Sequence, residues 1–133
     1  MSLTLHRMIR ALTANVAETA PEAEDPRLRG RTYAIPFDAV WRAATDLAGS
    51  LRGWTVTGSD DCEGIIQAEA RTLVMRFVDD VTIRIRLDEN AQTRVDMRSA
   101  SRKGVGDFGT NARRIDRFMR RLDKRLVERA GVA

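Results

Sequence analysis

The sequence has very little cysteine and histidine: Cys62 and His6 are the only ones in 133 residues. A single cysteine excludes a disulfide within the chain. A single histidine beside it excludes a Cys/His metal site and a histidine-dependent catalytic triad, because such sites need several of these side chains or a base beside the nucleophile. We therefore expect a chain that folds and works without a metal or another cofactor.

Long apolar runs are absent as well. No stretch approaches the roughly 18 consecutive apolar residues of a membrane-spanning helix. The N-terminus also lacks the compact apolar core and the small-residue cleavage site of a signal peptide. These absences predict a soluble chain, in the cytoplasm or associated with a cell envelope.

The composition is that of a globular protein, with 43% hydrophobic and 32% charged residues. It excludes collagen-like and wholly disordered classes, and 133 residues suit one domain. The net charge is +4, and residues 102–125 hold nine Arg or Lys against three Asp. Such a basic segment can meet phosphates, anionic lipid or an acidic partner. Because only two of the 23 basic residues are lysine and arginines occur along the whole chain, the excess also reflects overall composition.

The first 28 residues are predicted to form a helix and a linker. Apolar residues recur at helical spacing at Leu5, Met8, Ile9, Leu12 and Val16. Two prolines among small and acidic residues, Pro21 and Pro26, then prevent the helix from continuing. We expect a separate amphipathic N-terminal helix with a proline-rich acidic linker over residues 1–28, followed by a single α+β domain over residues 29–130.

The domain itself shows a clear order of elements. Pro36 precedes one apolar stripe at helical spacing, and Gly53 ends it. Strands are predicted at 31–35, 54–57, 65–71, 81–88 and 93–99. A last helix starts near Asp107 or Thr110 and carries an apolar stripe of Ile115, Phe118, Met119, Leu122 and Leu126. The order β-α-β-β-β-β-α predicts a two-layer α+β fold, with an antiparallel sheet of four to five strands and two helices on one face.

The candidate site is the connection between the last strand and the last helix, residues 99–114. It combines glycines at 104, 106 and 109 with the amides of a helix N-terminus, which suit an anion. We expect Arg102, Arg113 and Arg114 to contact the anion. Asp79 and Asp107 should position the loop, and Ser99, Ser101 and Asn111 should supply hydrogen bonds. The spacing matches neither a P-loop nor a dinucleotide fingerprint, so the loop taken by itself favours an ordinary turn capped by Asp107 or Thr110.

Two acidic clusters invite a catalytic or metal interpretation. Asp79 and Asp80 are adjacent on a strand, so they point to opposite faces and cannot readily share one ion. We expect Asp79 to pair with an arginine such as Arg102 or Arg113. The turn around Cys62 is acidic, but it has fewer potential ligands than a calcium-binding loop. Its carboxylates should raise the pKa of the Cys62 thiol, so we expect this thiol to be unreactive.

Three segments carry a resemblance to a known family. They are Phe-Val-Asp-Asp-Val at 77–81, Asp-Met-Arg-Ser-Ala-Ser-Arg-Lys-Gly at 96–104, and Gly-Asp-Phe-Gly-Thr-Asn-Ala-Arg-Arg-Ile at 106–115. With these motifs the chain resembles the family called domain of unknown function 1499, from about residue 25 to residue 126. The resemblance implies bacterial and plastid relatives, several of them associated with the envelope. It implies no mechanism, because no activity is established for them.

Three functions fit these residues. The favoured one is a non-catalytic domain that binds a small anionic ligand or a protein partner near the Ser-x-Ser-Arg and glycine-rich loop. One alternative is a hydrolase-like enzyme with Asp79 as its base, which requires an open cleft and an Asp79 without an arginine partner. The other is an assembly protein whose N-terminal helix contacts a partner or a membrane surface. Nucleic acid is not an expected partner, because no aromatic residue interleaves the basic face of the last helix.

Overall fold

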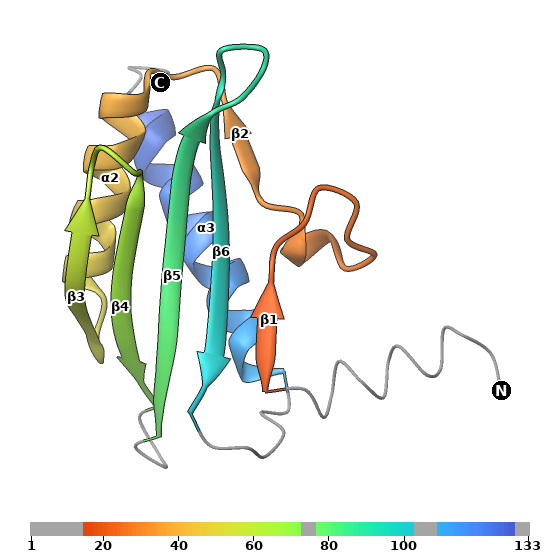
Figure 1. Cartoon of the computed structure of the whole chain (residues 1–133), viewed down its shortest axis with the longest axis vertical. Coiled ribbons are helices and arrows are strands. Elements are labelled where there is room, and N and C mark those ends of the chain that lie inside the picture. The colour runs from red at the N-terminus through yellow and green to blue at the C-terminus, as the bar shows by residue number, and fades with distance from the viewer. Residues whose placement is uncertain (1–14, 73–76, 103–108, 130–133) are drawn as a thin grey trace, which may run out of the picture.

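The computed structural model describes residues 15–72, 77–102 and 109–129. Within these ranges, six strands form one antiparallel sheet in the order β1-β6-β5-β4-β3, with β2 also paired to β6. The strands are β1 (Val16–Glu18), β2 (Arg31–Tyr33), β3 (Trp54–Asp60), β4 (Ile65–Arg71), β5 (Val78–Leu87) and β6 (Thr93–Ser101). The helices are the short 3-10 helix η1 (Pro26–Leu28), α2 (Phe37–Ser50) and α3 (Thr110–Arg129). Both α-helices lie on one face of the sheet, which confirms the predicted two-layer α+β architecture (Figure 1).

The sheet differs from the prediction at its β6 edge. Val16 belongs to a strand and not to the predicted N-terminal helix, since it pairs with Ala100 while Glu18 pairs with Arg98. β2, which corresponds to the predicted strand at 31–35, pairs further along the same edge, so it is β1 that brings the described sheet to six strands instead of four or five. The other positions of that predicted helix lie in residues 1–14, outside the described ranges. Its role in assembly therefore stays a prediction. The domain boundary at residue 29 stays a prediction.

Thr19 bridges the gap between β1 and β2 along β6. Its backbone N–H donates to the Met97 carbonyl over 2.9 Å, and its hydroxyl accepts from the Met97 N–H over 3.0 Å. The same hydroxyl donates to Asp96 Oδ1 over 2.7 Å. A single residue therefore provides hydrogen-bond partners for the Met97 backbone of β6, at the point where the edge strand is interrupted.

We expect Thr19→Val to keep the shape of this side chain and to leave the buried Met97 amide without its acceptor. An unpaired buried amide costs about 1–2 kcal/mol, so the free energy of unfolding in urea should fall by that amount. An unchanged urea midpoint would show that water replaces the hydroxyl at this edge.

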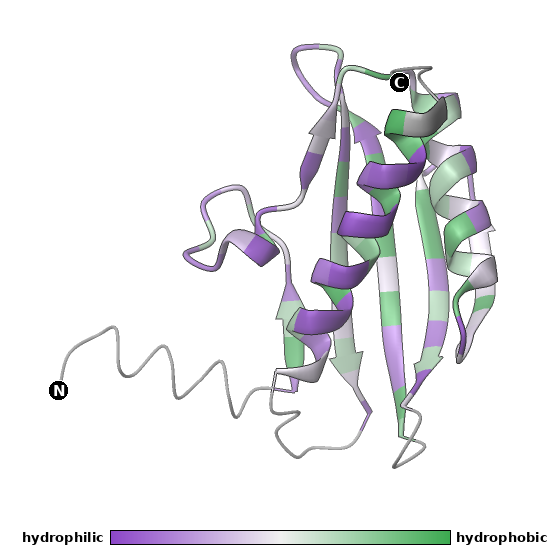
Figure 2. Ribbon diagram, turned by 180° about the vertical axis from the view of Figure 1, so that it is seen from behind, coloured by the Kyte–Doolittle hydropathy of each residue, from purple (hydrophilic) through white to green (hydrophobic). Residues whose placement is uncertain are grey.

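The core lies between the sheet and the two helices. α2 buries small and medium side chains, Val40, Ala43, Ala44, Leu47 and Ala48. α3 buries the whole predicted stripe of Ile115, Phe118, Met119, Leu122 and Leu126. The helices meet alternate residues of the central strands, including Ile66, Val81, Ile83, Ile85, Val95 and Met97. Figure 2 shows the consequence on α3, whose turns alternate between apolar residues toward the sheet and hydrophilic residues away from it.

A polar tether fixes β2 to α3. The Tyr33 hydroxyl donates to Asp123 Oδ1 over 2.5 Å, and Arg31 Nε donates to Asp123 Oδ2 over 3.1 Å. Burial, together with this carboxylate, raises the pKa of the Tyr33 hydroxyl above its ordinary value.

Among the described residues, no helix has both the length and the apolar character needed to cross a membrane.

Candidate anion-binding site

The first turns of α3 are held to the sheet by a buried ion pair. Arg114 Nη1 lies 2.7 Å from Asp79 Oδ2, and the two side chains are 11% and 2% exposed. Asp79 thus has an arginine partner, as expected, but the partner is Arg114 and not Arg102 or Arg113. The reason lies in helical spacing: Arg114 follows the buried Asn111 by three residues and therefore shares the face that α3 turns toward the sheet.

Three more of the predicted site residues join this pair. The Ser99 hydroxyl donates to Asn111 Oδ1 over 2.6 Å and accepts from Arg114 Nη1 over 3.1 Å. Arg114 Nη1 also donates to Asn111 Oδ1 over 2.8 Å. The Asn111 amide nitrogen donates to Ser101 Oγ over 3.0 Å and to the backbone carbonyl of residue 15 over 3.1 Å. Asp79, Ser99, Ser101, Asn111 and Arg114 therefore form one interior hydrogen-bond network, which we call the Asp79 network.

Two of the other predicted residues, Arg102 and Arg113, lie elsewhere. Arg102 is on the opposite, outer face of the sheet, where it forms ion pairs with Asp80 and Glu69. Its hydrogen bonds lower the pKa of the Asp80 carboxyl from its ordinary value. Arg113 is on the exposed side of α3, with Nη2 3.3 Å from Thr110 Oγ1. Asp107 lies outside the described residues.

The acidic turn after β3 behaves as a solvated turn. Its cysteine, Cys62, is free and exposed. Asp61 and then Asp60 raise the pKa of the thiol by their negative charge, as predicted. Asp60 Oδ1 also accepts the backbone N–H groups of residues 62 and 63, a local bonding pattern that accounts for an aspartate at this position.

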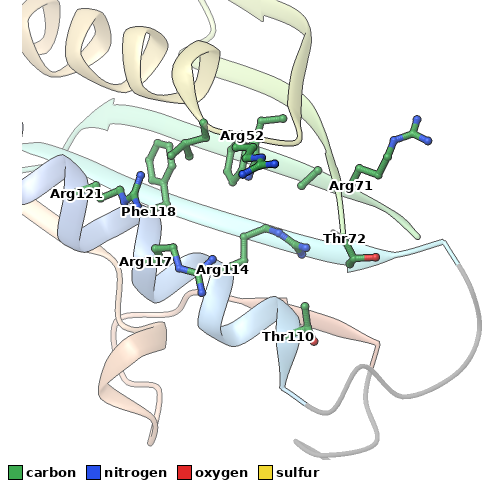
Figure 3. Close-up of a pocket in the computed structure, with 11 residues that line it drawn as sticks. Arg52, Arg71, Thr72, Thr110, Arg114, Arg117, Phe118 and Arg121 are labelled. Atoms are coloured by element: carbon green, nitrogen blue, oxygen red, sulfur yellow. The ribbon is translucent and has the colours of Figure 1, made fainter. Parts of the chain in front are cut away.

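A pocket of about 320 Å³ opens beside the Asp79 network, between the end of α2, the end of β4 and the first half of α3. Its lining consists of Arg52, Arg71, Arg114, Arg117, Arg121, Leu51, Trp54, Ala70, Phe118, Thr72 and Thr110. We call it the arginine pocket. Five of these eleven described residues are arginines and none is acidic. Figure 3 shows the five side chains arriving from three separate elements, with that of Arg71 extending away from α3.

Four of these five arginines have no charged partner in the part of the chain that the structure describes. Within the described part of the chain, no hydrogen bond or ion pair involves the guanidinium groups of Arg52, Arg71, Arg117 and Arg121. Arg114 is different, because its Nη1 group is bound in the Asp79 network. Its Nε and Nη2 make no hydrogen bond among the described residues, and no buried polar side-chain atom there lacks a partner, so these two atoms are accessible. Arg114 also lines the pocket (Figure 3), so it joins the interior network to the pocket.

A second hollow, of about 660 Å³, lies on the outer face of the sheet. It is lined by four arginines, Arg84, Arg86, Arg94 and Arg98, but also by Glu18 and Asp96. Arg94 is already paired with Asp96 over 2.8 Å. Because its charges are mixed and partly compensated, this outer groove is a weaker candidate for an anion than the arginine pocket.

The comparison with protein families gives one result. The model of the family described as a protein of unknown function (DUF1499) matches residues 10–122, which is most of the chain. The chain belongs to the DUF1499 family. This confirms the resemblance drawn from the motifs at 77–81, 96–104 and 106–115, all of which lie inside the matched range. A search of the curated proteins found no match.

The pocket of this DUF1499 chain contains residues that the sequence analysis did not select. Trp54, Arg52 and Arg71 come from segments that carry no motif, and only the fold brings them to α3. Arg117 and Arg121 did offer a signal, because with Arg114 they recur at intervals of three and four residues on one helix face. That pattern marks one wall of the arginine pocket, but it does not show that the wall encloses a cavity.

Proposed function

We propose that this DUF1499 protein is a non-catalytic domain that binds a small anionic ligand in the arginine pocket. The observation that carries the proposal is the lining of five arginines without a carboxylate among the described residues. The four lining arginines other than Arg114 are exposed, so water screens their mutual repulsion, but several positive charges around one opening still attract an anion. The volume of about 320 Å³ suits a small molecule.

The Asp79 network supports this function by fixing one of the arginines in place. Arg114 is oriented by Asp79, Ser99 and Asn111, so little side-chain freedom remains to be lost when a ligand binds its outward edge. Asp79, Ser99 and Asn111 therefore serve as supports behind the pocket, and the predicted site residue Arg114 belongs to the pocket lining itself.

The chemistry of the described residues favours binding over catalysis. Asp79 is 2% exposed and paired with Arg114, so it lacks the open cleft and the unpaired state that a catalytic base requires. Thr72 and Thr110 are the hydroxyl residues of the pocket lining. The described lining contains no aspartate, glutamate, histidine, cysteine or lysine that could activate these hydroxyl groups.

Inorganic phosphate is the simplest probe of this proposal. In low-salt buffer, phosphate should raise the melting temperature more than sodium chloride of the same ionic strength, because it binds the folded state alone. At ten times its Kd it adds about 1.4 kcal/mol of stability, which corresponds to several degrees for a domain of this size. Arg121→Gln should weaken phosphate binding by about tenfold or more in calorimetry, since it removes a charge-assisted contact.

Two variants control for nonspecific loss of charge. Arg42→Gln removes one positive charge from an exposed position on α2, outside both hollows, and should leave phosphate affinity unchanged. Arg98→Gln removes a charge from the outer groove. The proposal is overturned if phosphate gives no specific stabilisation, or if affinity falls with Arg98→Gln and not with Arg121→Gln.

A further inference from the structure

The arginine pocket also has an apolar side, and this narrows the class of ligand. We propose that the ligand is a small phosphate monoester whose phosphate meets the arginines and whose apolar body rests on the wall around Trp54. This inference rests on the proposed function, because it assumes an anion in the same pocket. It adds which anionic group is bound and what that group is attached to.

The number and direction of the arginines favour a phosphate over a carboxylate. A carboxylate has two oxygens, and one guanidinium group can satisfy both through a bidentate contact. A phosphate monoester has three terminal oxygens and a charge of about −1.5 to −2 at neutral pH. Arg52 approaches from the turn after α2, whereas Arg114, Arg117 and Arg121 approach from α3 (Figure 3). Donors that arrive from two sides match a tetrahedral group better than a planar one.

The electrostatic state of these arginines also favours a group with a double charge. Arg52, Arg117 and Arg121 have no carboxylate partner among the described residues, and each attracts a doubly charged group more strongly than a singly charged one. Arg114 is compensated by Asp79 at 2.7 Å. A dianion therefore gains more from this pocket than a monoanion of the same size.

The apolar wall indicates that the phosphate is not free. It consists of Leu51, Trp54, Ala70 and Phe118. The rings of Trp54 and Phe118 are stacked, with centroids 5.5 Å apart and planes 12° from parallel. Phe118 is 1% exposed, whereas Trp54 and Leu51 are half-buried and present apolar surface to the pocket. Inorganic phosphate cannot cover this surface, but a ring or a short chain attached to the phosphate would remove it from water.

The pocket volume limits the size of the apolar body. Ligand pockets in proteins run from about 300 to 1,000 Å³, so a pocket of about 320 Å³ lies at the small end of that range. A phosphate that carries one ring or a short chain suits a pocket of this size better than a nucleotide does.

The test compares four probes by titration calorimetry of the full chain at low ionic strength: phenyl phosphate, inorganic phosphate, benzoate and phenol. We expect phenyl phosphate to bind at least about tenfold more tightly than each of the other three, because it alone contacts both sides of the pocket. Arg121→Gln should weaken phenyl phosphate and inorganic phosphate alike. Arg42→Gln should leave the affinity of both unchanged.

A variant of the apolar wall separates the two parts of the ligand. Trp54→Leu should weaken phenyl phosphate by about fivefold or more and leave inorganic phosphate unchanged, since only the ester contacts the ring. Leu51→Ala is the second variant of this wall, for use if Trp54→Leu loses its folded circular dichroism spectrum. It should shift the two affinities in the same unequal way.

The other outcomes distinguish this inference from the proposed function. Equal affinities for phenyl phosphate and inorganic phosphate would overturn the apolar body and leave the proposed function standing. Benzoate as tight as phenyl phosphate would overturn the phosphate and leave a carboxylate ligand. Phenol as tight as phenyl phosphate would overturn the anionic part of both proposals, and so would the failure of every anion to bind.

Discussion

Asp79→Asn is expected to lower the free energy of unfolding by about 3 kcal/mol. The substitution keeps the size of the side chain and removes the negative charge that compensates Arg114 in an interior site, where the two side chains are 2% and 11% exposed. Removal of one partner from a buried ion pair costs about 3–5 kcal/mol, because the other charge is left without compensation. The lower end applies here, since the asparagine oxygen can still accept from Arg114. Urea denaturation followed by circular dichroism measures the effect.

The neighbouring residue provides a matched control. Asp80 also forms an ion pair with an arginine, Arg102, but its side chain is 51% exposed. Ion pairs between exposed side chains contribute little, so Asp80→Asn should leave the urea midpoint close to that of the wild type. If the two substitutions lowered stability equally, the difference in burial would not control the strength of these pairs, and the Asp79 network would not anchor α3.

Strand alternation was enough to predict how these two carboxylates differ. Adjacent residues of a strand face opposite sides, and Asp79 has the same parity as the buried Val81, Ile83 and Ile85. The partner of Asp79 was not predictable in the same way. It depends on the rotation of α3 about its axis, which follows from how the whole apolar stripe packs on the sheet. A shift of one position along the helix would bring Arg113 to the sheet and turn Arg114 away from it.

The arginine pocket could not be predicted from local patterns. Its arginines come from the turn after α2, the end of β4 and one face of α3, which are far apart in the sequence. Arginine is also frequent along the whole chain, so no single one of these positions stands out by composition. What distinguishes them is the absence of a carboxylate among the described residues around the pocket, and this is a property of the three-dimensional arrangement.

The hairpins of the fold were predictable because their strands are long enough to show a period. β5 and β6 alternate buried residues with half-buried or exposed ones over most of their length, as their sequence alternation predicts. β1 has three residues, too few to define a period, and its Val16 continues the helical spacing of Leu5, Met8, Ile9 and Leu12. Its extended state follows from pairing with β6, a long-range contact that no local pattern encodes.

Gly64→Ala should be among the most destabilising single substitutions in the β3–β4 hairpin. Gly64 has a φ of +71°, and a Cβ built at this position would lie 1.9 Å from the Ile85 carbonyl oxygen. The Gly64 backbone cannot withdraw freely, because its carbonyl accepts the Ile85 N–H over 2.7 Å and its N–H donates to Asp60 over 2.8 Å. Left-handed strain and displacement of the neighbouring backbone together cost about 3 kcal/mol or more. Chemical denaturation measures this cost.

Gly49→Ala is the control for the effect of replacing a glycine by alanine where the new Cβ meets no neighbouring atom. Gly49 lies in the last turn of α2, and a Cβ there meets no atom within 4 Å. Alanine loses less conformational entropy than glycine when a helix forms, so Gly49→Ala should raise the free energy of unfolding by about 0.5–1 kcal/mol. Opposite signs for two identical replacements would trace the cost at Gly64 to its left-handed backbone and the approach of β5, and not to the loss of a glycine as such. A decrease of less than about 1 kcal/mol for Gly64→Ala would mean that β4 and β5 can separate locally without loss of the hairpin.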